Sequence, residues 1–240
     1  PPETQLLLET YLKQLRLPGI LRSYQQFAED AAQANQPYER YLLALAQLEL
    51  AQRDQHRQTR RTVAARFPLL KELADFDFSA IPSLNKQQVL ELAQGEYIAR
   101  AEPILLIGNP GLGKTHIGIA LALAACRQGR RVRFYNAAGL VNELLAAQEA
   151  HQLPRLLNTA LRHDLIMLDE LGFIPFSPLG AQLMFQFCST LYERVALIIT
   201  SNLRFGDWRV LCLFAYHDPA RVRQDRFTAL IEAGRADVDD

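Results

Sequence analysis

The residues Gly108-Asn109-Pro110-Gly111-Leu112-Gly113-Lys114-Thr115 decide the fold of this chain. They match the pattern G-x-x-x-x-G-K-S/T, follow a short apolar run and precede a predicted helix over 116–127, which is the context of a phosphate-binding loop. Glycines let backbone N–H groups turn toward phosphates, and the helix N-terminus adds a positive dipole end. We expect nucleotide phosphates to be bound by Gly108, Asn109, Pro110, Gly111, Leu112, Gly113, Lys114, Thr115 and His116.

Two acids follow a second apolar run, at 165–168. If this run is a strand of a parallel sheet, Asp169 and Glu170 lie at the carboxyl edge where such sheets bind ligands. We expect Asp169 and the Thr115 hydroxyl to hold Mg²⁺, and Lys114 to bridge the β- and γ-phosphates. Glu170 is the candidate base for an attacking water, which favours hydrolysis over transfer to another substrate.

A third apolar run, at 197–200, ends in Ser201-Asn202. Neighbouring strand ends converge on the γ-phosphate in such sheets, so Asn202 is a candidate for sensing phosphate or positioning water. An asparagine after a strand is more often simply a turn former. The chain lacks an Asn-Lys-x-Asp guanine-reading motif, so the sequence favours ATP over GTP.

Short apolar runs rich in branched residues alternate with helical stretches from Pro103 onward. The runs lie at 104–107, 132–135, 165–168 and 197–200 and predict an α/β core whose parallel sheet is covered by helices on both faces. A connector with a short helix near 87–93 precedes this core. The first seventy or so residues predict only helices: one before a break at Pro18-Gly19, one over about 21–34, and a long one after Pro37.

The far half of the long helix is basic, with five arginines and one acid between residues 53 and 66. Arg53, Arg57, Arg60 and Arg61 share one helical face and form a stripe that could follow a nucleic-acid backbone. A solvated helix face explains the same pattern, and the segment alone leaves both interpretations open.

Composition excludes some classes of protein. Lys and Arg together number 26, as do Asp and Glu, so the chain is not a wholly basic nucleic-acid-coating protein. Three cysteines at no metal-ligand spacing are typical of buried thiols in a reducing compartment. The sequence shows neither a signal peptide nor an apolar stretch long enough for a membrane span, and we expect a cytoplasmic protein without a membrane partner.

The chain resembles the IstB-type transposition helper ATPases of the AAA+ class, which are related to DnaC-type helicase loaders. Three stretches carry the resemblance: GNPGLGKTHIGIAL at 108–121, LIMLDELGFIPFSPLGAQLMFQ at 165–186 and YERVALIITSNLRFGDW at 192–208. The motifs ARFP at 65–68 and DFDFS at 75–79 add to it. The run LGFIP and the pattern TSN-x-x-F-x-x-W are more specific than the phosphate loop, which many unrelated proteins share.

The resemblance implies a Mg²⁺-dependent ATPase that oligomerises on duplex DNA, as a ring or a helical filament, and assists the transposase of the same insertion sequence. It makes Lys114 and Thr115 the Walker A pair, Asp169 and Glu170 the Walker B pair, and Asn202 the sensor-1 residue. It also favours a DNA-binding role for the arginine stripe. The implied domains are a helical N-terminal domain (1–72), a connector (73–102), an AAA+ core (103–207) and a divergent tail (208–240).

The tail departs from the family after Trp208. The usual helix that carries an arginine finger is not recognisable in 209–240, and Asp225-Arg226 matches it only superficially. Three alternatives stay open: a DnaC-like loader of a replicative helicase, a non-hydrolysing ATP-dependent DNA-binding scaffold, and a small-molecule kinase. Retention of Lys114 and Glu170 argues against the scaffold. The absence of an obvious arginine-rich lid argues against the kinase.

Overall fold

The computed structural model describes residues 2–82, 84–172 and 176–202. The predicted tail from 208 onward, with Trp208 and Asp225-Arg226, lies outside these residues. The chain consists of two compact units, and the boundary between them in the sequence lies between Arg60 and Arg61. The predicted domain limits at 72, 102 and 207 stay predictions.

The first unit is helical. It holds α1 (Pro2–Gln14), α2 (Pro18–Gln33) and most of α3 (Tyr38–Ala65), which is the long helix predicted after Pro37. The predicted break at Pro18-Gly19 was wrong by a few residues, because α1 ends at Gln14 and Pro18 already begins α2. Proline suits the first position of a helix, where its missing N–H costs no hydrogen bond.

The start of α2 is held by a residue far along the chain. Glu49 is only 4% exposed, and its carboxylate accepts hydrogen bonds from the backbone N–H of Gly19 at 2.7 Å and of Ile20 at 3.1 Å. Arg53 Nε donates to the other oxygen of Glu49 at 2.8 Å, and its Nη2 donates to the carbonyl of Arg16 at 2.6 Å. Glu49 therefore caps α2 from α3, and Arg53 connects this cap to the turn before α2.

The second unit is built on a parallel sheet of four described strands. These are β1 (Pro103–Ile107), β2 (Val132–Asn136), β3 (Leu165–Asp169) and β4 (Ala196–Ser201), in the order β1-β4-β3-β2. Each predicted apolar run forms a strand, extended by one residue at one or both ends. The predicted α/β fold with a parallel sheet and a helical N-terminal part is confirmed.

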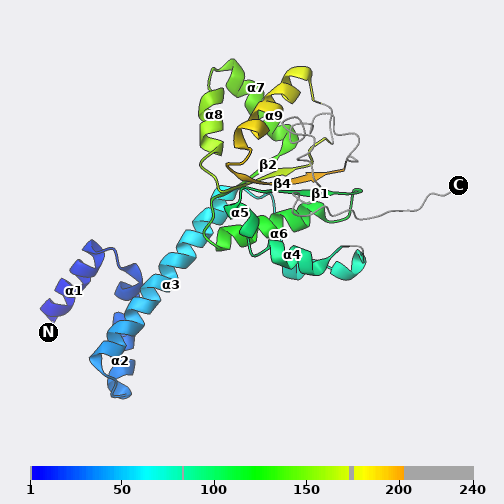
Figure 1. Ribbon diagram of the computed structural model, residues 1–240. Helices are drawn as coiled ribbons and strands as arrows, with labels where there is room; N and C mark the ends of the chain where they lie inside the picture. Colours follow the sequence, from blue (N-terminus) through cyan, green and yellow to red (C-terminus); the bar gives the residue numbers. More distant parts are fainter. Residues whose placement is uncertain (1, 83, 173–175, 203–240) are drawn as a thin grey trace. The chain divides into compact units, whose positions relative to one another are not determined.

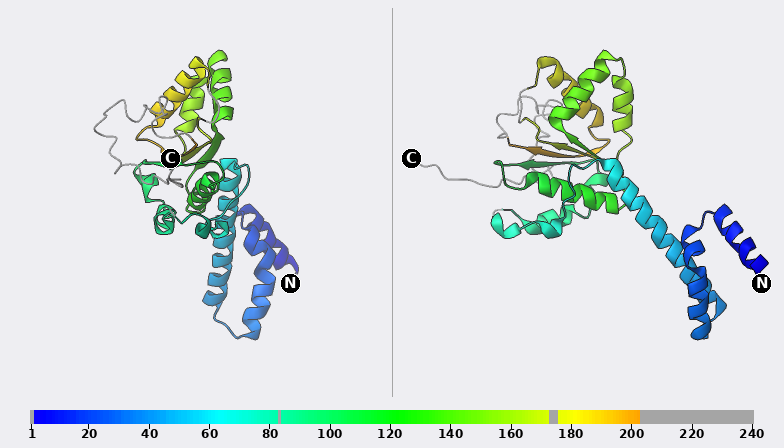
Figure 2. Two further views of the ribbon diagram at one scale, coloured as in Figure 1. Left: turned by 90° about the vertical axis from the view of Figure 1, so that its right-hand side faces the viewer. Right: turned by 180° about the vertical axis from the view of Figure 1, so that it is seen from behind.

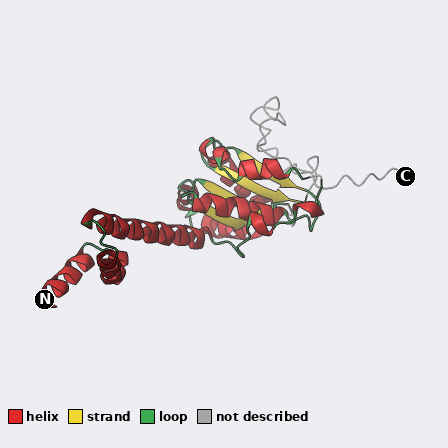
Figure 3. Ribbon diagram, turned by 90° about the horizontal axis from the view of Figure 1, so that it is seen from below, coloured by secondary structure: helices red, strands yellow, loops and turns green. Residues whose placement is uncertain are grey.

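Helices cover both faces of the sheet (Figures 1 and 2). One face packs against α6 (Lys114–Arg127), α4 (Lys86–Leu92) and α5 (Glu96–Ala99), and receives alternate strand side chains such as Ile104, Leu106 and Met167. The other face packs against α7 (Ala137–Glu149), α8 (Leu153–Ala160) and α9 (Pro178–Leu191), and receives Leu105 and Leu168. Figure 3 shows the strands between the two helical layers.

The connector contributes two short 3-10 turns, η1 (Leu73–Asp75) and η2 (Phe78–Ala80), before the short helix predicted near 87–93. Phe76, between these turns, packs edge-on against Phe78 and His116. None of the described helices combines the length and apolar character needed to cross a membrane.

Candidate nucleotide site

The phosphate loop connects β1 to α6, as the sequence predicts, but the helix begins two residues earlier than expected, at Lys114. Lys114 and Thr115 therefore lie in the first turn of α6, where backbone N–H groups have no partner within the helix. Gly113 precedes the helix with φ of 71°, a conformation that glycine adopts without strain. A Cβ there would also lie 2.6 Å from the ring of Phe76.

The Lys114 ammonium group lies over the loop. Nζ donates hydrogen bonds to the carbonyls of Gly108 at 2.8 Å and Asn109 at 2.7 Å. The residue is 9% exposed, and this burial lowers the pKa of Lys114, while the charge of Asp169 opposes the shift. A buried ammonium near a single carboxylate is suited to binding an additional anion, because phosphate oxygens would offset its cost of desolvation.

Asp169 is the centre of a hydrogen-bond network that joins the end of β3 to α6 and to β4. Its Oδ1 accepts from the Thr115 hydroxyl at 2.8 Å and from the Thr200 hydroxyl at 2.7 Å. The same Thr200 oxygen accepts from the backbone N–H of Glu170 at 2.9 Å. The carboxylate that ends β3 is thus fixed to the first turn of α6 and to β4.

Glu170 follows Asp169 with φ of 59°, in the left-handed region. Its side chain is exposed, and Oε2 accepts a hydrogen bond from Asn136 Nδ2 at 2.9 Å. Asn136 ends β2, and its Oδ1 also accepts from the N–H groups of Ala138 and Gly139 at the start of α7. One amide side chain therefore caps a helix and holds the glutamate.

The structure brings most of the predicted site residues to one edge of the sheet. Asn202 follows β4 at this edge and is half-buried. His116 differs from the rest of the predicted phosphate-binding set, because its ring Nε2 lies 2.8 Å from the carbonyl of Glu72 and its ring meets Phe76. The imidazole of His116 contacts the connector, and a phosphate-binding role for its side chain stays a prediction.

Sequence reasoning missed Asn136 and Thr200. Both are polar residues at the carboxyl ends of strands, the signal that identified Asp169 and Asn202, so the same rule could have found them. The sequence assigns Thr200 only to a strand, although Thr200 is 1% exposed and its hydroxyl orients Asp169. The residues that Asp169 binds lie 31 or more positions away in sequence and could not be read locally.

The predicted arginine stripe lies on α3. Arg53 is bound to Glu49 and to the turn before α2, and Arg57 pairs with Asp54 at 3.2 Å. Arg60 is exposed, and Arg61 packs its guanidinium beside Gly129. DNA binding by Arg53, Arg57, Arg60 and Arg61 stays a prediction.

The family model described as IstB-like ATP binding protein matches residues 10–220 of the chain. The chain belongs to this family. The family is described as ATP-binding, so the predicted resemblance to the IstB-type proteins is confirmed. The match continues beyond Trp208, into the segment in which the sequence pattern was not recognisable.

Relatives from insertion sequences match most of the chain. An insertion sequence ATP-binding protein of Sinorhizobium fredii is 37% identical over 210 residues, covering 87% of this chain and 69% of the relative. The ATP-binding protein named for insertion sequence IS21 of Pseudomonas aeruginosa is 34% identical over 84% of this chain and 76% of its own length.

A solved structure shares the fold of about two thirds of this chain. The replication initiator DnaA bound to AMPPCP and single-stranded DNA superposes with a TM-score of 0.53 at 22% identity. The match covers 68% of this chain and 49% of the DnaA chain, so the IstB-like chain corresponds to about half of that protein. This similarity supports the AAA+ fold.

Proposed function

We propose that this IstB-like protein is a Mg²⁺-dependent ATPase that oligomerises on duplex DNA and assists the transposase of its own insertion sequence. The observation that carries the ATPase part is the network in which Asp169 joins Thr115 of the phosphate loop to Thr200 of β4, with Glu170 next to it. Binding of nucleotide phosphates needs only the loop. Hydrolysis needs, in addition, the two positioned carboxylates.

In the proposed reaction, water attacks the γ-phosphorus of ATP and the bond to the β,γ-bridging oxygen breaks. Lys114 and the N–H groups at the start of α6 stabilise the negative charge of the phosphoryl oxygens. Glu170 orients the water and accepts its proton, and Asn202 contributes a side-chain amide to the γ-phosphate. Asn136 Nδ2 donates a hydrogen bond to Oε2 of Glu170, so Oε2 faces a water only after this hydrogen bond breaks.

The residues present fit a magnesium ion. The Thr115 hydroxyl and the Asp169 carboxylate are hard oxygen ligands that lie 2.8 Å apart. Mg²⁺ is typically bound by one or two such groups together with phosphates and water, and among the described residues no cluster of three or more His, Cys, Asp or Glu forms a metal cage. Bound between Thr115, Asp169 and ATP, the ion would neutralise charge on the β- and γ-phosphates.

The DNA and transposase parts of the proposal rest on the relatives and on the arginines of α3. The similar proteins are named for insertion sequences, whose mobility requires DNA breakage and joining. Subunits of AAA+ proteins contact one another head to tail, and such contacts close into rings or extend into helical filaments. Either assembly could wrap duplex DNA.

The proposal is tested by measuring binding to a non-specific DNA duplex with ATP, with ADP and without nucleotide, using light scattering or sedimentation to follow particle size. We expect large, salt-sensitive complexes only with ATP. The Lys114→Ala variant is the control, because it should fail to bind nucleotide and to assemble. Equal assembly of Lys114→Ala in the presence of ATP would contradict a nucleotide-gated complex.

Single-stranded DNA and Glu170→Gln separate the alternatives. A helicase loader should prefer the single strand, whereas a transposition helper should prefer the duplex. Glu170→Gln removes the base but keeps the phosphate contacts, so we expect ATP turnover to fall at least about a hundredfold while DNA-bound complexes persist. ATP turnover at the wild-type rate in Glu170→Gln would show that Glu170 is not the base. If the DNA-bound complexes of the wild-type protein persist with ATP as long as those of Glu170→Gln, the non-hydrolysing scaffold is favoured.

A further inference from the structure

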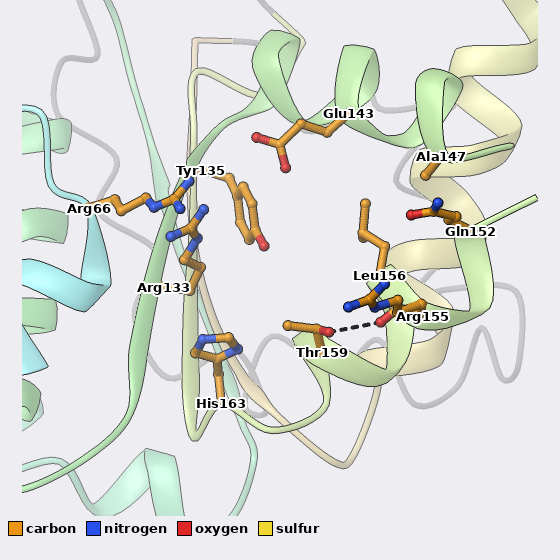
Figure 4. Close-up of a pocket in the computed structure, with 10 residues that line it drawn as sticks. All are labelled: Arg66, Arg133, Tyr135, Glu143, Ala147, Gln152, Arg155, Leu156, Thr159 and His163. Atoms are coloured by element: carbon orange, nitrogen blue, oxygen red, sulfur yellow. Dashed lines mark hydrogen bonds between the residues drawn. The ribbon is translucent and has the colours of Figure 1, made fainter. Parts of the chain in front are cut away.

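A second polar pocket lies in the same unit, at the edge strand β2 of the described sheet. It has a volume of about 390 Å³ and opens between β2, α7, α8 and the residues that follow α3 (Figure 4). Arg133 is the second residue of β2, and His163 precedes β3, so part of the lining lies where the strands begin. The phosphate loop follows the opposite, carboxyl end of β1, so the pocket is separate from the nucleotide site.

The lining is strongly basic. Arg66 follows α3, Arg133 comes from β2 and Arg155 from the first turn of α8, and Figure 4 shows the three guanidinium groups around one open space. Glu143 of α7 is the single acid in the lining, which leaves a formal charge of +2 with His163 neutral. Within the described part of the chain, none of these arginines forms an ion pair.

Contacts within the unit hold Arg133 in place. It stacks over the ring of Tyr135 with its guanidinium carbon 5.0 Å from the ring centre, and its Nη1 donates to the carbonyl of Ala64 at 3.4 Å. Stacking leaves the remaining N–H groups of the guanidinium plane available. The Thr159 hydroxyl donates to the carbonyl of Arg155 at 2.8 Å, so it is not a free donor to a ligand.

We propose that this pocket binds a phosphate group. One guanidinium would satisfy a carboxylate, but three of them from separate elements match an oxyanion with three or four acceptor oxygens and more than one negative charge. The phosphate can come from a small phosphorylated molecule or from a nucleic-acid backbone, and the pocket does not depend on the ATPase assignment.

His163 provides a local readout. Burial lowers the pKa of its imidazole below the usual 6.5, and Arg133 and Arg131 lower it further, while hydrogen bonds to the backbone oppose the shift. A phosphate dianion among the arginines would stabilise the imidazolium form. Binding should therefore raise the pKa of His163 in a saturable way.

The experiment titrates inorganic phosphate into the 240-residue chain and follows the ring signals of His163 by NMR. Chloride salt keeps the ionic strength constant during the titration. The Lys114→Ala substitution is present throughout, so that the phosphate loop does not contribute. Arg155→Gln should weaken phosphate affinity about tenfold or more, because it removes charge-assisted hydrogen bonds. Arg162→Gln is the matched control, an exposed arginine just after α8 that does not line the pocket, and it should bind as the parent does.

A non-saturating shift, or equal phosphate affinity in the Arg155→Gln and Arg162→Gln variants, would overturn the proposal. Circular dichroism of both variants confirms that they fold. Duplex DNA then distinguishes the two sources of phosphate. If the source is a DNA backbone, Arg155→Gln in the otherwise wild-type chain lowers the salt dependence of DNA binding by about one unit. If it is a small molecule, DNA binding is unchanged while inorganic phosphate binding is still weakened.

Discussion

Asn136 links the cap of α7 to the carboxylate of Glu170. This hydrogen bond occupies Oε2 of Glu170, so a water at that oxygen has to compete with the amide. In the position described, Oε2 of Glu170 is therefore less available to a water than it would be if released. Any event that withdraws Asn136, such as a movement of β2 or α7, would activate the site.

Asn136→Ser tests this link. Serine can still cap α7, so the cost of losing a cap, about 1 kcal/mol, is largely avoided. Its shorter side chain does not reach Glu170. We expect the rate of ATP hydrolysis without DNA to rise severalfold, measured by phosphate release, with nucleotide affinity unchanged.

The matched variant Asn136→Ala loses both the cap and the amide. If the gain in rate comes from release of Glu170, both variants should hydrolyse ATP faster, and only the alanine variant should also unfold at lower urea concentration. A decrease in rate for Asn136→Ser would instead mean that Asn136 holds Glu170 in its productive position.

The site residues that the sequence revealed are those carried by contiguous motifs. Lys114, Thr115 and the pair Asp169-Glu170 could be placed because each motif adjoins an apolar run that has to be a buried strand. Asn136 and Thr200 act through contacts between strands that are distant in sequence. The strand-end rule could have named both residues as candidates, but a single sequence does not report the contacts that give them their roles.

Among the elements, the core strands were predictable and the start of α2 was not. Runs of branched apolar residues specify buried strands almost by themselves, so the predicted and observed strands differ only by one residue at their ends. The corner before α2 depends on Glu49, which lies 30 residues after Gly19 and accepts its N–H. Pro18 by itself fits either a break or the first position of a helix, and the contact from Glu49 favours the second.

Glu49 should make the helical unit sensitive to pH. Burial alone would raise the pKa of its carboxyl, but the hydrogen bonds from Arg53 and from the N–H groups of Ile20 and Gly19 outweigh it, so the pKa is below the usual 4.5. A lowered pKa means that the stabilisation is complete above pH 4.5 and is lost as the pH falls through the folded value. We expect the protection of the Gly19 and Ile20 amides from hydrogen exchange to decrease over that range.

Glu49→Gln should abolish this pH dependence and destabilise the α1–α3 unit by about 1–3 kcal/mol, since a charge-assisted cap becomes a neutral one. Urea unfolding followed by circular dichroism measures the loss. Glu39→Gln is the control: Glu39 lies on the same helix, in its exposed first turn. Equal behaviour of the two variants would show that the Glu49 hydrogen bonds contribute nothing to stability.

For the whole molecule, the arginines of α3 are the predicted contact with duplex DNA. They differ in whether their guanidinium groups are already bound to other parts of the protein. Arg53 already serves the cap of α2, so its loss would mix folding with binding. Arg57 pairs with the exposed Asp54, and Arg60 is exposed. These two arginines therefore test DNA binding with the least effect on the fold.

Replacing Arg57 and Arg60 with alanine should weaken duplex binding irrespective of sequence and reduce its salt dependence by about one unit for each phosphate that the protein no longer neutralises. Fluorescence anisotropy at several salt concentrations with ATP measures both quantities. Lysine at both positions keeps the charges and should keep the slope, because counterion release depends on charge more than on geometry. If the salt dependence of duplex binding stays the same in the alanine variant, these arginines do not contact DNA and the DNA-binding site lies on another surface.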